Sequence, residues 1–277
     1  MLDHATVQPS DQQLLDEFSS ALDLVEDRVP MRASYSRIDP YILECDQAEI
    51  RFRFLIYHRE SHLWFGTPER KDAVLQHVAD FSLVKRGDTV FDLGCNSGFL
   101  TTWFAKKVGS TGRVLAFDPF PWNTLATSFS ARLNSCQNVE CLTIGIADAD
   151  RFVTIPIVDS KTDENPKLTA HGTFEAELVP LDRFAAYLPQ FIKVDIEGAE
   201  RHLLAGAAAL LSQSPKPIWF LEIHNQFIRN AGSDPDQIPR VFLAHGYDCR
   251  IHHPRGGIFQ TDNILPEGCA LFALPNS

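Results

Sequence analysis

The sequence predicts an α/β domain built on a seven-stranded, mostly parallel sheet with helices on both faces. From residue 89 onward, short β-branched runs alternate with segments of helical periodicity, which is typical of βαβ units. A glycine-containing turn joins the first of these strands to the first helix. The expected strands are Thr89–Leu93, Val114–Phe117, Val139–Ile144, Phe191–Val194, Ile218–Ile223, Tyr247–Ile251 and Cys269–Leu274.

Helices are expected between most of these strands, at Gly98–Val108, Trp122–Leu133, Ala199–Leu211 and Asp236–His245. One interval breaks the alternation. Two extended segments, Arg151–Val158 and Phe174–Pro180, flank a polar loop at residues 159–171. We expect a β-hairpin inserted before the fourth core strand, with its loop acting as a lid over the substrate.

The N-terminal region differs in pattern from the rest of the chain. Apolar residues at near-helical spacing predict an amphipathic helix over residues 12–28, and strand-like patterns follow at 41–43 and 50–56. Residues 68–78 look helical. The expected organisation is an α+β accessory segment at 1–80 and a Rossmann-like domain at 81–277, with the insertion near 150–180.

Composition limits the partners and the location of the protein. The chain has 25 Lys and Arg residues against 36 Asp and Glu, a net charge of −11, which disfavours a nucleic-acid partner. No secretory signal and no apolar run of about 18 residues is visible, so we expect no membrane partner. Six cysteines without a Cys-x-x-Cys pair predict reduced thiols and a cytoplasmic location.

A cofactor site is predicted where the first strand runs into the glycine turn. The turn carries Asp92, Gly94, Asn96 and Gly98, and Asp118 ends the next strand, where a carboxylate can accept hydrogen bonds from both ribose hydroxyls of a nucleoside. The dinucleotide fingerprint Gly-x-Gly-x-x-Gly lacks two of its three glycines here. A nucleoside cofactor other than a nicotinamide dinucleotide is therefore expected.

The spacing Asp-x-Gly-x-x-x-Gly resembles motif I of class I methyltransferases, which use S-adenosyl-L-methionine. That resemblance implies that Asp92 lies near the amino group of the methionine moiety. It also implies that Gly94, Asn96 and Gly98 shape the turn, and that Asp118 holds the ribose. A weaker match at residues 145–148 implies that Ala147 lies by the adenine ring.

A second motif is more specific. Leu181-Asp182 is followed by Asp195-Ile196-Glu197-Gly198-Ala199-Glu200, and then by Leu221-Glu222-Ile223-His224. Over residues 85–225 the chain resembles the FkbM family of methyltransferases. The resemblance implies O-methylation of a hydroxyl on a small molecule, a sugar or glycan, or a polyketide-type natural product.

Candidate catalytic residues stand at the ends of predicted strands, where ligands bind in open α/β sheets. Asp195 is the first choice as general base or as the carboxylate that orients the acceptor, and His224, oriented by Glu222, is the second. A divalent metal such as Mg²⁺ held by Asp195, Glu222 and His224, with Asn225 as a further ligand, is an alternative. Glu197 also fits the simpler role of a helix-capping carboxylate.

Two other functions stay open at this level. One is a methyltransferase that acts on a macromolecule, and the other is a non-catalytic domain that binds the cofactor. The amphipathic N-terminal helix is compatible with a homodimer.

Overall fold

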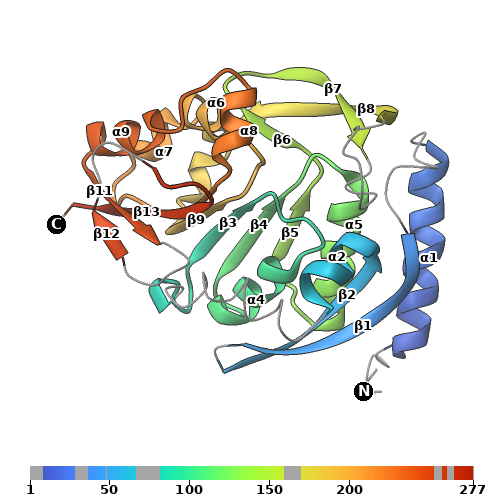
Figure 1. Cartoon of the computed structure of the whole chain (residues 1–277). Coiled ribbons are helices and arrows are strands. Elements are labelled where there is room, and N and C mark those ends of the chain that lie inside the picture. The colour runs from blue at the N-terminus through green and yellow to red at the C-terminus, as the bar shows by residue number, and fades with distance from the viewer. Residues whose placement is uncertain are drawn as a thin grey trace.

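The computed structural model describes residues 9–28, 37–47, 49–66, 82–158, 170–252, 258–260 and 265–276. All seven predicted strands lie in one sheet, in the order β12-β11-β13-β10-β9-β3-β4-β5, with the short strand β12 at one edge (Figure 1). Their bounds are β3 Thr89–Leu93, β4 Arg113–Phe117, β5 Val139–Leu142, β9 Phe191–Val194, β10 Ile218–Ile223, β11 Tyr247–His252, β12 Ile258–Gln260 and β13 Cys269–Pro275. The predicted α/β class is confirmed.

The sheet is parallel from β10 through β9, β3 and β4 to β5, and antiparallel at β13, β11 and β12. The chain first builds outward from β3 to β4 and β5, and then returns to place β9 on the other side of β3. The carboxyl ends of β3 and β9 therefore form a topological switch point, which is where open α/β sheets leave a crevice for ligands.

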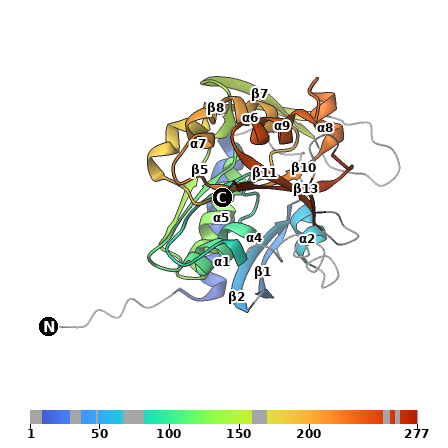
Figure 2. The ribbon, with the colours of Figure 1, turned by 90° about the vertical axis from the view of Figure 1, so that its left-hand side faces the viewer.

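Helices cover both faces of this sheet, as Figure 2 shows. One face packs against α6, α7 and α9 through buried residues such as Leu203, Leu210 and Phe242. The other packs against α4, where Trp103 and Phe104 are buried. The helices are α4 Phe99–Val108, α5 Pro121–Leu133, α6 Glu200–Ala205, α7 Ala208–Leu211, α8 Asn225–Asn230, α9 Gln237–Ala244 and the 3₁₀ helix η2 Leu181–Tyr187.

The helix predicted over Ala199–Leu211 is wrong in one respect, because it is broken between α6 and α7. Gly206 stands at the break, and a Cβ atom there would lie 2.0 Å from the carbonyl oxygen of Ala147. The helix is therefore interrupted where its backbone packs directly on Ala147 of the short strand β6, Gly145–Ala147. The short helices α8 and η2 were not predicted, since each is too short to show a periodic pattern.

The insertion forms a separate three-stranded sheet in the order β6-β8-β7, with strands β6 Gly145–Ala147, β7 Arg151–Val158 and β8 Ala170–Pro180. β7 and β8 pair antiparallel, as the predicted hairpin requires. β6 adds a parallel strand beside β8. Residues 159–169 of the predicted lid loop lie outside the described residues.

The N-terminal segment packs against the helices α4 and α5. It contains α1 Asp11–Arg28, a hairpin of β1 Arg37–Gln47 and β2 Ile50–His58, and α2 Arg59–Phe65. Phe18 of α1 makes edge-to-face contacts with Tyr57 of β2 and Phe129 of α5. The helix predicted at 68–78 lies outside the described residues. Across the described ranges, no helix is long and apolar enough to cross a bilayer.

Candidate functional site

The glycine turn after β3 brings two parts of the chain into direct contact. Gly94 has a φ of 75°, and a Cβ atom there would lie 1.8 Å from the carbonyl oxygen of Asp195. Gly98 has a φ of 86°, and a Cβ atom there would meet Thr127 of α5 at 2.7 Å. These glycines are thus required by the close approach of the protein's own backbone as well as by their left-handed conformation. The predicted cofactor turn and the predicted catalytic strand end are neighbours.

Asp118 lies at the carboxyl end of β4, is only 5% exposed and is held by three donors. Its Oδ1 accepts from the Phe120 amide and from Asn123 Nδ2, each at 3.0 Å, and its Oδ2 accepts from the Asn96 amide at 3.0 Å. A carboxylate offers about four lone-pair sites, so room is left for one further donor rather than for both ribose hydroxyls. Burial raises the pKa of Asp118 to about 6, although these hydrogen bonds oppose that shift.

Asp92 is completely buried behind the turn. Thr101 Oγ1 donates to its Oδ2 at 2.5 Å, and Lys193 Nζ lies 3.2 Å from its Oδ1. The cation that Asp92 meets in the structure is therefore Lys193. Its contact with the amino group of the methionine moiety stays a prediction.

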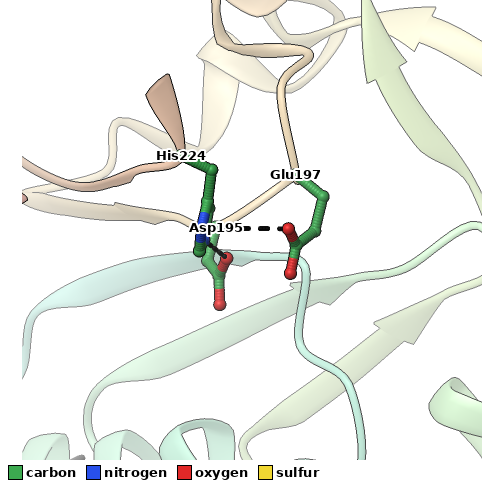
Figure 3. Close-up of side chains that lie close together, drawn as sticks. All are labelled: Asp195, Glu197 and His224. Atoms are coloured by element: carbon green, nitrogen blue, oxygen red, sulfur yellow. Dashed lines mark hydrogen bonds and ion pairs between the residues drawn. The ribbon is translucent and has the colours of Figure 1, made fainter. Parts of the chain in front are cut away.

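The residues at the ends of β9 and β10 come together as Figure 3 shows. His224 Nε2 lies 3.1 Å from Asp195 Oδ1, and His224 Nδ1 lies 3.9 Å from Glu197 Oε2. The side chains of Asp195 and His224 are 28% and 32% exposed, so the pair is reachable from solvent. The expectation that Glu222 orients His224 is corrected, because the residue that hydrogen-bonds His224 is Asp195.

The charges of this cluster shift its protonation. The hydrogen bond to Asp195 raises the pKa of His224 to about 9, with Glu197 adding to the effect and burial opposing it. Burial alone would raise the pKa of Asp195, but the Lys193 ammonium and the hydrogen bond from His224 hold it below its ordinary value. Burial and the charge of Asp195 raise the pKa of Glu222 to about 7.

The geometry changes the set of candidate metal ligands. Ligand atoms of Asp195, Glu197 and His224 all lie within 4.8 Å of one another, and Glu222 is not part of this group. Glu197 has a φ of 54°, which is uncommon for a residue with a side chain, and its Oε2 lies 3.9 Å from His224 Nδ1. The sequence pattern had suggested a helix-capping role for Glu197 as readily as a functional one.

Lys193 was missed by the sequence interpretation. It is 3% exposed, and its Nζ donates to the Gly94 carbonyl oxygen at 2.8 Å and lies 3.8 Å from Asp195 Oδ2. It therefore joins Asp92, the glycine turn and Asp195. The signal available in the sequence was a lysine inside an otherwise apolar strand, where a buried charge needs a partner.

Ala147 and Asn96 remain predictions as cofactor contacts. Ala147 is buried in β6 with its carbonyl oxygen facing Gly206. Asn96 has a φ of 48°, and its side-chain oxygen accepts from the amide and the hydroxyl of Ser97.

Comparison with known proteins identifies the family. The sequence pattern of the methyltransferase FkbM domain matches residues 92–249, which is more than half of the chain. The chain belongs to the FkbM methyltransferase family. Its fold and its family are those of S-adenosylmethionine-dependent methyltransferases. A comparison with curated proteins gave no match.

Three solved structures that are similar to this FkbM-family chain share little sequence with it. A methyltransferase FkbM from Methylobacillus flagellatus is 19% identical with a TM-score of 0.46, over 67% of this chain and 43% of that one. An S-adenosylmethionine-dependent O-methyltransferase from Thermotoga maritima is 12% identical, with a TM-score of 0.44, over 85% and 78% of the two chains. Aeropyrum pernix fibrillarin with natively bound S-adenosyl-L-methionine is 10% identical, with a TM-score of 0.44, over 87% and 98%. The chain spans less than half of the length of the first of these proteins, and none of the three similarities indicates a shared substrate.

The cofactor assignment of Asp118 has a direct test. We expect Asp118→Ala to weaken binding of S-adenosylhomocysteine by about tenfold or more, because a hydrogen bond to a charged group contributes about 1.5–3 kcal/mol. Isothermal titration of both proteins at pH 8 measures this loss. Equal affinity in the two proteins would remove Asp118 from the cofactor site.

Proposed function

We propose that this protein transfers a methyl group from S-adenosyl-L-methionine to a hydroxyl oxygen of a small molecule, a sugar or glycan, or a polyketide-type product. The observation that carries the proposal is the Asp195–His224 pair, at the carboxyl ends of β9 and β10 and against the glycine turn at Gly94. A proton-accepting pair beside a methyl donor is what oxygen methylation needs.

Hydroxyl acceptors need help because they hold their proton tightly, with a pKa of about 15.7 for water. The bound cofactor supplies a methyl group on a sulfonium, which leaves as the neutral thioether S-adenosylhomocysteine. The acceptor oxygen forms the new C–O bond while the C–S bond breaks and its electron pair goes to sulfur. His224 takes the proton that the hydroxyl gives up.

His224 is a better proton acceptor here than Asp195. A general base is strongest when its pKa lies near or above the working pH, and Asp195 is held below its ordinary value while His224 is raised to about 9. With Nε2–H donating to Asp195 Oδ1, the neutral imidazole presents Nδ1 as the acceptor. Asp195 then orients the ring and stabilises the imidazolium that forms, as in other base and carboxylate pairs.

The pH dependence of the reaction distinguishes these roles. The raised pKa means that His224 is mainly protonated below pH 9, so a reaction that needs neutral His224 is suppressed there. We expect kcat/KM to rise about tenfold per pH unit from pH 7 and to level off near pH 9. If Asp195 accepted the proton directly, the profile would be flat across this range.

Glu222 provides the control, because its pKa of about 7 lies inside the same range. Glu222→Gln should keep the rise that ends near pH 9, since His224 remains. If Glu222→Gln lost that rise, the rise would be due to ionisation of Glu222, and His224 would not be the base.

A divalent cation held by Asp195, Glu197 and His224 is a second candidate for activating the hydroxyl, favoured by their mutual distances. A metal would have to displace the proton of His224. Activity assayed with Mg²⁺ and with EDTA separates the two, because the proton-transfer route is expected to be unchanged by EDTA.

The acceptor class is tested with a panel of sugars, polyols and hydroxylated polyketides, with methyl transfer followed by S-adenosylhomocysteine release. We place the reaction in the cytoplasm, consistent with six free thiols. Methylation confined to a protein or an RNA would favour the macromolecular alternative, and cofactor binding without turnover on any of these substrates would favour a sensor.

A further inference from the structure

The last two residues of β2 reach toward the cofactor turn from the N-terminal segment. Tyr57 and His58 are buried, and their rings meet edge to face at 4.5 Å. Tyr57 Oη donates to Asn123 Oδ1 at 2.9 Å, and Asn123 Nδ2 donates to Asp118 Oδ1 at 3.0 Å. One residue of α5 thus separates β2 from the carboxylate predicted to hold the ribose.

His58 makes a second connection, and its tautomer follows from its partners. The Ser61 amide donates to Nδ1 at 3.1 Å, so in the neutral ring the hydrogen is on Nε2. Burial lowers the pKa of His58 to about 4, so the ring is neutral at physiological pH. Nε2 then donates to Ser97 Oγ at 3.3 Å, and Ser97 Oγ donates to Asn96 Oδ1 at 2.8 Å.

Both connections end on the same carboxylate. The Asn96 amide donates to Asp118 Oδ2 at 3.0 Å, while Asn123 holds Oδ1. Asn96 has a positive φ of 48°, a conformation that a residue with a side chain keeps only when its surroundings hold it. The path through Ser97 is one such restraint.

We propose that Tyr57 and His58 are positioning residues of the cofactor site, and that β2 holds Asp118 and the glycine turn in the geometry that binds the cofactor. This inference rests on the assignment of Asp118 to the cofactor site. It gives the N-terminal segment a part in cofactor binding, where the sequence suggested only an accessory role.

The ionisation of Asp118 provides a readout that a purely structural role would not move. The Asn123 and Asn96 donors both act to lower its pKa against burial. If Tyr57 no longer holds Oδ1 of Asn123, the amide can turn away and the pKa of Asp118 rises. An ionised Asp118 is needed to accept a hydrogen bond from the ribose, so affinity for the cofactor falls as the pH is lowered. With a raised pKa of Asp118, this loss of affinity would begin at a higher pH than in the unsubstituted protein.

Other titratable groups near Asp118 do not interfere between pH 5 and 8. Burial raises the pKa of the Cys95 thiol in the turn well above its ordinary value. Burial acts to lower the pKa of Lys193 on β9, but the charges of its carboxylate partners outweigh burial and raise it above its ordinary value. His58 on β2 titrates near 4. Lys193 Nζ lies 3.2 Å from Asp92 Oδ1 on β3. Glu222, at the end of β10, has a pKa of about 7 and also titrates in this range, but its pKa responds to Asp195, whereas the pKa of Asp118 is the one that the Asn123 and Asn96 donors lower.

Two variants isolate the two paths. Tyr57→Phe removes only the hydroxyl and keeps the ring against Phe18. His58→Asn removes the reach to Ser97 but keeps a good N-cap for α2, where His58 now accepts from the Ser61 amide. Ser130→Ala is the matched control. Ser130 Oγ accepts from the Leu55 amide, so this hydrogen bond also links β2 to α5, but it belongs to neither of the two paths to Asp118.

The experiment is titration of each full-length variant with S-adenosylhomocysteine from pH 5 to 8, with thermal unfolding of the free proteins alongside. We expect both variants to bind about two- to tenfold more weakly at pH 7, and the pH midpoint of binding to rise by about 0.5–1 unit. Ser130→Ala should keep the wild-type midpoint near pH 6, whatever its effect on unfolding.

Four results would overturn the inference. Wild-type affinity and midpoint in both variants would show that neither path matters, and an equal shift in Ser130→Ala would show that any loosening of β2 has the same effect. If the unsubstituted protein does not bind S-adenosylhomocysteine, or if Asp118→Ala binds it as well as wild type, the cofactor assignment itself fails and this inference fails with it.

Discussion

Replacing His224 by glutamine is expected to lower kcat by about 10²–10⁴-fold, the usual contribution of a positioned general base. Glutamine approximates the size of the ring and can still donate a hydrogen bond to Asp195, but it cannot accept a proton. S-adenosylhomocysteine should bind with unchanged affinity, because His224 lies at the end of β10 and makes none of the hydrogen bonds to Asp118.

The matched control carries the same substitution at an exposed histidine. His202 lies on α6 with its side chain 46% exposed, and its Nδ1 lies 3.6 Å from Asp148 Oδ1. His202→Gln is expected to leave kcat unchanged. Steady-state kinetics of both variants at pH 8 and 9.5 make the comparison. Full activity in His224→Gln would remove this residue from the reaction.

Replacing Lys193 by methionine is expected to lower the free energy of unfolding by about 3–5 kcal/mol, the typical cost of breaking a buried ion pair. The ammonium is the cationic partner of the fully buried Asp92 and lies 3.8 Å from Asp195. Methionine fills similar space but leaves the Asp92 charge uncompensated, and it also leaves the Gly94 carbonyl oxygen without the lysine donor.

The loss should depend on pH in a defined direction. Burial acts to raise the pKa of Asp195, and the Lys193 ammonium is the largest effect that lowers it, so in the variant Asp195 is protonated at a higher pH and the cost of its buried charge falls as the pH falls. Denaturant unfolding at pH 8 and at pH 5 should therefore show a smaller loss at pH 5.

An exposed ion pair is the control for this stability measurement. Arg151 pairs with Asp148 at 2.5 Å, with side chains 36% and 41% exposed, so Arg151→Met should cost no more than about 1 kcal/mol. If Lys193→Met lowered the free energy of unfolding as little as Arg151→Met, Lys193 would not be needed to compensate the buried charge of Asp92.

Much of the fold was predictable from sequence because local pattern and burial agree along the core strands. β3, β9 and β10 have the predicted bounds, since each is a short apolar run that ends at a polar residue or a turn. The break between α6 and α7 was not predictable, because it depends on the contact of Gly206 with Ala147, 59 positions earlier in a different element.

Candidate site residues could be identified by type and by position at strand ends, but their partners could not. The sequence by itself determined that carboxylates and a histidine follow β9 and β10, and that a glycine turn follows β3. Only the tertiary structure decided that Asp195 rather than Glu222 bonds His224, that Lys193 joins Asp92 to Asp195, and that Tyr57 and His58 reach Asp118 through other residues. The physical reason is that hydrogen bonds and ion pairs depend on distances of a few ångströms between side chains. Strand order and crossing of elements set those distances, whereas local sequence sets only which groups are available.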